Sequence, residues 1–212
     1  MSSWGVSPEE KLRSFPCDRF VKDFDASIYR GVSIQTPPSV VFRWLCQMRV
    51  APYSYDWIDN RGRKSPRVLT QGVERLEHGQ IMMGFELVEF EQDQHLTLQG
   101  GSPFLGYGVG SYMIVPISKD TCRLLVKMVI KYPKGPRGLV ARLIMPWGDM
   151  IMMRRQLLNF KELSEETYRN STVSNDSTSL GPAGELLSEE RHVLKDYGFR
   201  WSWRLIMLPQ GS

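Results

Sequence analysis

The order in which strand patterns and helix patterns follow one another is the feature that most limits the fold of this chain. Residues 27–36 alternate in polarity, which predicts a strand with one face formed by Ile28, Arg30, Val32 and Ile34. Helical spacing follows over residues 36–48. Strand patterns then return over 79–91, 94–100, 110–117 and 121–132. A helical pattern closes the series at about residue 166, so the order predicts an α+β protein with an antiparallel sheet.

Glycine and proline predict where these elements bend or end. Gly84 interrupts the pattern of residues 79–91 and predicts a bulge or bend. The run GGSPFLGYGVG at 100–110 predicts a glycine-rich connecting loop, and residues 60–80 predict another loop. Pro146 predicts a division between a short helix and a longer one.

The composition divides the chain into four parts. Residues 1–26 show no clear period and predict an irregular lead-in to a domain at 27–168. Residues 169–184 are polar and poor in apolar side chains, which predicts a flexible linker. The tail at 185–212 combines a weakly amphipathic helix pattern with the Trp-rich segment FRWSWRLIML.

Cysteine usage and hydropathy favour a cytoplasmic protein. The three cysteines, Cys17, Cys46 and Cys122, are widely spaced and form no CxxC pair, which favours a reducing compartment. The first residues lack the apolar core of a signal peptide. The most apolar stretch, 138–153, is interrupted by Arg142, Pro146 and Asp149 and is short for a bilayer span.

The net charge of +4 is unevenly placed. Residues 61–67 and 131–142 each carry four basic side chains and no acidic one. These segments are interpreted either as solvated loops or as a surface for an anionic partner. Because no nucleic-acid-binding motif surrounds them, nucleic-acid binding is not expected.

Motifs for nucleophilic or metal chemistry are absent from the sequence. There is no GxSxG, and the histidines His78, His95 and His192 show neither triad nor metal-ligand spacing. We therefore expect His78 and His95 to be exposed histidines at a turn or strand edge. We predict no metal and no cofactor.

Residues 51–67 contain the densest group of aromatic and acidic side chains. Asp56 and Asp59 are three apart and would share a face if the segment is helical, as paired carboxylates for acid–base chemistry do. Tyr53, Tyr55 and Trp57 suit the rim of a pocket. Three interpretations stay open: a structural cap, a pocket wall, and a catalytic site in which Asp56, Asp59 and Tyr55 take part.

Methionine is concentrated in the later strands and the last helix. Met150, Met153 and Leu157 fall on one helical stripe, and Met128 lies in the strand at 121–132. A stripe of this kind is most often core, but flexible thioether side chains also suit a cavity for varied apolar ligands.

These segments resemble a known superfamily. The stretch YRGVSIQTPPSVVFRWLCQMRVAPYSYDWIDNRGRKSPR, with GQIMMGFELVEFE, TCRLLVKMVIKY and MMRRQLLNFKELSEE, is similar to the SRPBCC (START/Bet v 1-like) superfamily over residues 17–166. The resemblance is to its polyketide cyclase/dehydrase and lipid-transport type, in an uncharacterised bacterial branch. It implies a helix-grip fold, in which a curved antiparallel sheet wraps around a long C-terminal helix with an internal hydrophobic cavity.

The resemblance implies a hydrophobic ligand but no catalytic set, because catalytic residues differ between branches of the superfamily. Our first hypothesis is a carrier for an apolar small molecule such as a lipid or polyketide. The candidate ligand-binding residues are Trp44, Tyr53, Tyr55, Trp57, Phe85, Met128, Met150, Met153 and Leu157.

Two alternatives complete the predictions. One is a cyclase or dehydratase acting on a polyketide-like substrate, with Asp56 or Asp59 as general base and a tyrosine hydroxyl that stabilises an enolate. The other is an interaction module whose C-terminal tail docks on a membrane or a protein. The sequence favours a binding protein over an enzyme.

Overall fold

The computed structural model describes residues 3–102 and 106–178, and all of its helices and strands lie within these ranges. The strands form one sheet of seven in the order β1-β2-β7-β6-β5-β4-β3. Their bounds are β1 (Ser3–Trp4), β2 (Ala26–Ile34), β3 (Ile81–Met82), β4 (Phe85–Glu91), β5 (His95–Ser102), β6 (Gly106–Ser118) and β7 (Thr121–Lys131). The helices are α1 (Pro8–Lys11), α2 (Pro38–Cys46), α3 (Asp56–Asp59) and α4 (Pro136–Thr178), with short 3-10 turns η1 (Pro16–Arg19) and η2 (Gln47–Arg49).

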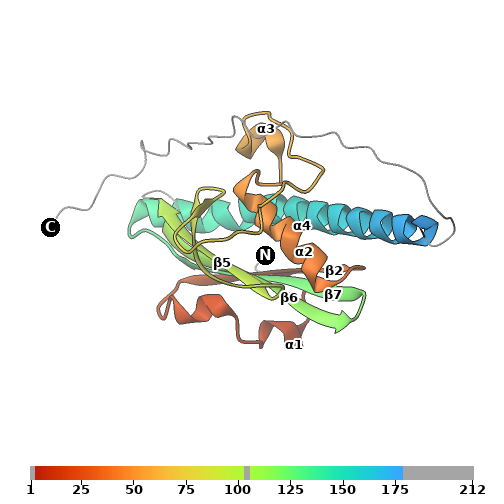
Figure 1. Cartoon of the computed structure of the whole chain (residues 1–212). Coiled ribbons are helices and arrows are strands. Elements are labelled where there is room, and N and C mark those ends of the chain that lie inside the picture. The colour runs from red at the N-terminus through yellow and green to blue at the C-terminus, as the bar shows by residue number, and fades with distance from the viewer. Residues whose placement is uncertain (1–2, 103–105, 179–212) are drawn as a thin grey trace.

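The predicted fold class is confirmed. Strand β1 pairs with β2 in parallel, and every other neighbouring pair in this sheet is antiparallel. Helix α4 is long and lies across one face of the curved sheet, with α2 beside it (Figure 1). The arrangement is the α+β, helix-grip architecture that the order of periodicities and the resemblance implied.

Both faces of the sheet are covered. The main core lies under α2 and the second half of α4, and contains Val32, Ile34, Trp44, Leu45, Leu96, Leu124, Leu157 and Phe160. A smaller core on the opposite face contains Phe15, Cys17, Val109, Leu125 and Val129, beneath the N-terminal segment that carries α1 and η1 (Figure 1). The sheet therefore buries apolar side chains in both directions, which explains the apolar residues at both parities of β7.

The pattern at residues 79–91 forms a hairpin. Met82 pairs with Phe85, so Met83 and Gly84 are the two residues of the turn between β3 and β4. Both have positive φ, 52° and 83°, as the turns that match strand twist require. The predicted bend at Gly84 is confirmed, although a non-glycine residue shares its conformation.

The prediction of a glycine-rich loop over residues 100–110 is wrong for its described part. β5 continues to Ser102 and β6 begins at Gly106, so Gly108 and Gly110 are paired strand residues. Backbone hydrogen bonds to β5 and β7 hold these glycines, and a sheet ladder needs no side chain. Local composition could not reveal this long-range pairing.

Pro146 does not divide the last helix, because α4 runs without interruption from Pro136 to Thr178. A proline inside a helix removes one backbone donor, and the other hydrogen bonds on either side continue the helix here. The helix also covers 169–178, which lie within the predicted linker. The remainder of that linker and the tail at 185–212 lie outside the described residues.

The N-terminal lead-in is more regular than its sequence indicated. Ser7 caps α1 with a capping box: its side chain accepts from the backbone of Glu10, and Glu10 accepts from the backbone of Ser7. Glu10 also forms an ion pair of 2.8 Å with Arg123 of β7. These contacts fix the segment against the outer face of the sheet.

The three cysteines are unpaired and buried. No helix among the described residues combines the length and the apolarity that a membrane span requires.

We predict that Leu157→Ala lowers the free energy of unfolding by about 3 kcal/mol, because Leu157 is fully buried and the change leaves a cavity. Urea denaturation measures this loss. The matched control is Leu139→Ala on the same helix, whose side chain is mostly exposed and whose loss should stay within about 0.5 kcal/mol. Equal effects of the two changes would contradict the position assigned to α4.

Candidate functional site

A cavity of about 770 Å³ lies between the first half of α4 and the sheet. Its size is within the range of small-molecule sites in proteins. The walls come from β4–β7, from the β3–β4 turn, from α4, and from Pro52 and Ser54. The lining residues include Ser54, Met83, Phe85, Gly100, Gly108, Gly110, Tyr112, Met128, Ile144, Met145, Asp149, Met152, Met153 and Gln156.

The space above β6 exists because side chains are missing from the strand. Gly108 and Gly110 line the cavity, and a Cβ atom at Gly110 would meet other atoms only at 3.7 Å or more, an ordinary contact distance. Gly100 of β5 has another role, since a Cβ atom there would come within 2.7 Å of the Phe85 ring. Glycine at 100 thus lets Phe85 pack against the strand, while glycine at 108 and 110 leaves volume empty.

Five methionines among the described residues line the cavity. Met145, Met152 and Met153 reach the cavity from α4, Met128 from β7, and Met83 from the β3–β4 turn. Thioether side chains are flexible and polarisable, so a wall of this composition adjusts to apolar ligands of different shape.

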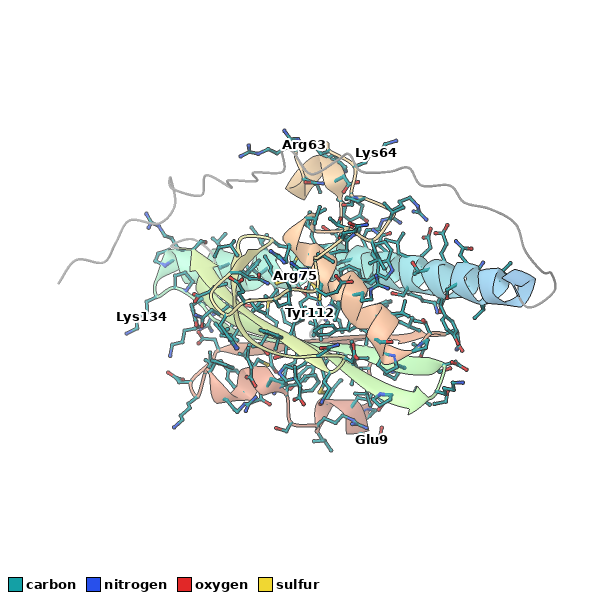
Figure 2. The ribbon with its side chains drawn as sticks, in the orientation of Figure 1. Glu9, Arg63, Lys64, Arg75, Tyr112 and Lys134 are labelled. Carbon is teal, nitrogen blue, oxygen red and sulfur yellow. The ribbon has the colours of Figure 1, made fainter. Side chains whose placement is uncertain are left out.

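The polar part of the cavity begins with Tyr112, a buried residue of β6 that is labelled near the centre of the molecule in Figure 2. Its hydroxyl donates to Oε1 of Gln156 at 2.8 Å. The Gln156 amide donates in turn to the carbonyl of Pro52 at 2.6 Å and lies 3.1 Å from the Met83 sulfur. Burial raises the pKa of Tyr112, so the hydroxyl stays protonated at neutral pH.

A buried ion pair stands beside these groups. Arg30 of β2 donates through Nη2 to Oδ2 of Asp149 at 2.6 Å, and the two side chains are 1% and 7% exposed. Arg30 Nη1 also donates to the carbonyl of Tyr29 at 2.9 Å. Asp149 lines the cavity, and its second oxygen, Oδ1, accepts no hydrogen bond from the described residues. Burial raises the pKa of Asp149, and the Arg30 guanidinium opposes that shift.

Three of the candidate ligand-binding residues lie at this cavity: Phe85, Met128 and Met153. Three others, Trp44, Tyr53 and Leu157, lie in the main core instead. The remaining three, Tyr55, Trp57 and Met150, are not among the lining residues, and Trp57 is 75% exposed. Of the predicted stripe, Met153 lines the cavity and Leu157 packs in the main core, whereas Met150 belongs to neither group. One face of the helix thus contacts different neighbours along its length.

In the aromatic and acidic segment at 51–67, Tyr53 contacts the core and Asp56 contacts its own loop. Tyr53 has a positive φ of 58° and packs edge-on against Trp44, with its hydroxyl on the carbonyl of Pro66 at 2.9 Å. Asp56 accepts from the backbone and hydroxyl of Ser65 at 3.0 and 2.6 Å and so closes the loop after α3.

The other members of this segment contribute less to the cavity than their residue types indicated. Asp59 ends α3, and its side chain lies outside what the structure describes. The segment lines the cavity through Pro52 and Ser54 rather than through its aromatic residues.

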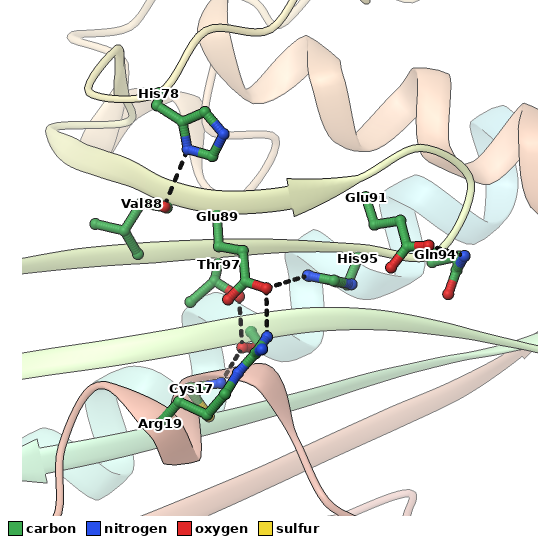
Figure 3. Close-up of polar contacts among 10 residues, drawn as sticks. Cys17, Arg19, His78, Val88, Glu89, Glu91, Gln94, His95 and Thr97 are labelled. Atoms are coloured by element: carbon green, nitrogen blue, oxygen red, sulfur yellow. Dashed lines mark hydrogen bonds and ion pairs between the residues drawn. The ribbon is translucent and has the colours of Figure 1, made fainter.

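The histidines among the described residues contact neither the cavity nor a nucleophile. His78 Nδ1 lies 3.1 Å from the carbonyl of Val88. His95 is buried, contrary to expectation, and lies 3.5 Å from Glu89, which also pairs with Arg19 (Figure 3). This cluster ties η1 to β4 and β5 on the outer face of the sheet. Within the described parts of the chain, no group of three His, Cys, Asp or Glu side chains could hold a metal ion.

Sequence reasoning missed three polar residues of the cavity, Tyr112, Asp149 and Gln156, and the ion-pair partner Arg30. One signal for the ion pair was present. Arg30 falls in phase with the apolar face of its strand, and Asp149 interrupts the most apolar stretch of the chain. Charged side chains are rarely buried unless they are paired. A basic and an acidic residue that both occur in apolar stretches are therefore candidates for a buried ion pair. Tyr112 and Gln156 carried no comparable signal.

No protein-family model matches this chain, and no curated protein matches it. Solved structures do show similarity. A hypothetical protein from Helicobacter pylori has 15% identity and a TM-score of 0.45, over 71% of this chain and 95% of its own. The di-domain ARO/CYC protein BexL of the BE-7585A biosynthetic pathway has 12% identity and a TM-score of 0.46, over 66% of this chain and 47% of its own.

A norcoclaurine synthase point mutant from Thalictrum has 12% identity and a TM-score of 0.38, over 66% of this chain and 94% of its own.

We predict that Arg30→Met lowers the free energy of unfolding by about 3–5 kcal/mol at neutral pH, because it leaves the Asp149 carboxylate buried without a partner. The loss should shrink as the pH falls. The folded-state pKa of the unpaired Asp149 is raised above its unfolded value, so proton uptake stabilises the folded form below that pKa. Urea denaturation across a pH series measures both effects.

The double variant Arg30→Met/Asp149→Leu is the control. It removes both charges and should recover most of the stability that the single change loses. If the single and double variants lost the same stability at every pH, the two side chains would not form a coupled pair.

Proposed function

We propose that this protein binds a largely apolar small molecule that carries a hydroxyl or amino group. The observation that carries the proposal is a cavity of about 770 Å³ whose apolar walls of methionine and glycine surround a buried carboxylate. Apolar burial would supply affinity, at roughly 25 cal/mol per Å² before the costs of association. This reading keeps the carrier hypothesis and the SRPBCC resemblance, with which the helix-grip architecture agrees.

The open polar atoms of the cavity define the polar group of the ligand. Asp149 Oδ1 is an acceptor without a donor among the described residues. The Tyr112 hydrogen is donated to Gln156, so the oxygen of that hydroxyl keeps an unused lone pair. Two acceptors in one apolar cavity favour a ligand that donates, such as an alcohol, phenol or amine, and disfavour a carboxylate or phosphate.

The first experiment is native mass spectrometry of the purified protein, followed by solvent extraction and identification of any released molecule. Binding is then measured by displacement of a fluorescent apolar probe with an alkyl alcohol, amine and carboxylate of equal chain length. We expect the alcohol and amine to bind at least about ten-fold more tightly than the carboxylate, because the carboxylate would lie beside Asp149. Equal affinities would contradict the assigned polar site, and no displacement by any of them would contradict the binding function.

We predict that Gly110→Val weakens probe binding by about ten-fold or more without loss of stability. The added side chain enters the empty space above β6, and valine favours strand conformation over glycine. The control is Gly72→Val, in a loop outside the cavity, where an added Cβ atom would contact no other atom. Because φ at this position is 73°, valine should lower the stability. The affinity of the folded protein for the probe should stay unchanged. Unchanged probe binding in Gly110→Val would exclude this cavity as the binding site.

A second function is favoured by the position of Asp149. A buried carboxylate with a raised pKa, close to a tyrosine hydroxyl in an apolar cavity, is the arrangement that the cyclase or dehydratase hypothesis requires. In that function Asp149, rather than Asp56 or Asp59, would act as general base. The Tyr112 hydroxyl would turn its hydrogen from Gln156 to the developing oxygen anion.

The enzyme alternative makes its own prediction. Asp149→Asn should reduce turnover of a cyclisable polyketide analogue by about 100-fold or more, as expected when a general base is removed. The matched change Asp56→Asn should leave turnover unaffected, because Asp56 bonds Ser65 away from the cavity. Product formation measured by chromatography decides the matter, and full activity of Asp149→Asn would reject this mechanism.

A further inference from the structure

The first half of α4 exposes a continuous apolar face. Leu143, Ile144 and Trp147 are 66%, 61% and 59% exposed. Three further residues of the same half are more than half exposed: Leu139, Val140 and Ile151. Soluble monomers rarely expose apolar side chains in one contiguous group of this kind, and such a group marks an interaction surface.

Helical spacing places these residues together and apart from the cavity. The exposed positions follow one another at intervals of one, three and four residues, so at 100° per residue they occupy one side of α4. Met145, Asp149 and Met153 fall on the other side and line the cavity. This half of α4 is therefore apolar in two directions, and only one of them is covered by the rest of the described protein.

The rim of the exposed face is basic. Lys131, Lys134, Arg137 and Arg142 lie in or just before this part of α4, and no acidic residue occurs between 131 and 148. Lys131 and Arg142 are balanced by ion pairs with Asp23 and Asp25. Lys134 forms no ion pair with any described residue and projects outward at the end of the molecule where α4 begins (Figure 2).

We propose that this face, defined by residues 139–151 of α4 with its basic rim, docks on an anionic lipid surface. Apolar residues that include a tryptophan, beside lysine and arginine, match the boundary between lipid headgroups and acyl chains. The positive charge of the rim favours an anionic lipid surface over the other candidates. A second copy of the chain would bring the same basic rim, and the apolar tail segment 199–208 carries Arg200 and Arg204 without an acid.

The docked face would adjoin an opening of the cavity. Ile144 belongs to both, since it is exposed and also lines the cavity. Phe85 and Tyr107 are further lining residues, and each is 41% exposed. A ligand could then pass between the cavity and the lipid phase without crossing bulk water. The docking itself rests on α4 and the basic residues just before it, and does not depend on which ligand the cavity holds.

The test is co-sedimentation of the full chain with vesicles of phosphatidylcholine alone and of phosphatidylcholine with phosphatidylglycerol. We expect binding to the anionic vesicles, weakened by salt, and little binding to the neutral ones. Leu143→Glu/Trp147→Glu should reduce anionic binding by about ten-fold or more, because it removes two apolar contacts and adds two negative charges. Circular dichroism and urea denaturation confirm that this exposed double change leaves the fold intact.

Two matched variants make the result specific. Val68→Glu/Ile117→Glu adds the same charge at two exposed apolar residues outside this face, and should retain most of the binding. Trp201→Glu/Trp203→Glu changes the tail and should also retain it. The proposal is overturned if the wild type ignores anionic vesicles or binds neutral ones equally well. It is also overturned if the tail change abolishes binding while the α4 change does not, or if the α4 change alters only self-association in analytical ultracentrifugation.

Discussion

The contact between α4 and the sheet is the constraint on which the other features depend. In the second half of the helix, Leu157 and Phe160 pack directly into the main core, so the helix axis is fixed there. The first half continues the same axis over β5 and β6, where Gly108 and Gly110 leave the strand without side chains. The unbroken helix over strand positions that carry no side chain encloses volume, and this is the origin of the cavity.

The ion pair between Arg30 and Asp149 fixes the first half of α4 across that volume. Its partners are 119 residues apart in sequence and come from the strand at one side of the sheet and the helix above it. Removing two charges from water costs free energy, and the pair offsets this only in part. Apolar replacements of buried ion pairs often stabilise a protein equally well, so stability alone does not account for this pair.

The architecture could be predicted from the sequence because it depends on local periodicity. The alternation around Val32 and Leu124 and the helical spacing around Leu45 specify their elements without reference to distant residues. The cavity could be predicted only in part. Phe85, Met128 and Met153 line it, whereas Trp44 and Leu157 have the same apolar character and fill the core.

The difference between these two groups depends on what each side chain faces across the sheet, and composition does not encode that. The errors have the same cause. The glycines of β6 indicated a loop because glycine is common in loops. The neighbouring strands β5 and β7, which hold these glycines by backbone pairing, cannot be recognised from the local sequence. Asp56 was a candidate base because it is an acid among aromatic residues, yet its oxygens accept from the backbone and the hydroxyl of Ser65.

The glycines of β6 have a consequence for how the specificity of this fold can diverge. The volume of the cavity is set by absent side chains at Gly108 and Gly110, and the backbone conformation at these positions is one that other residues adopt. Single substitutions to alanine or valine would therefore fill the pocket in graded steps while every ladder hydrogen bond is kept. Relatives with the same framework could select ligands of different length through these two positions, with no change in the chemistry of the polar end.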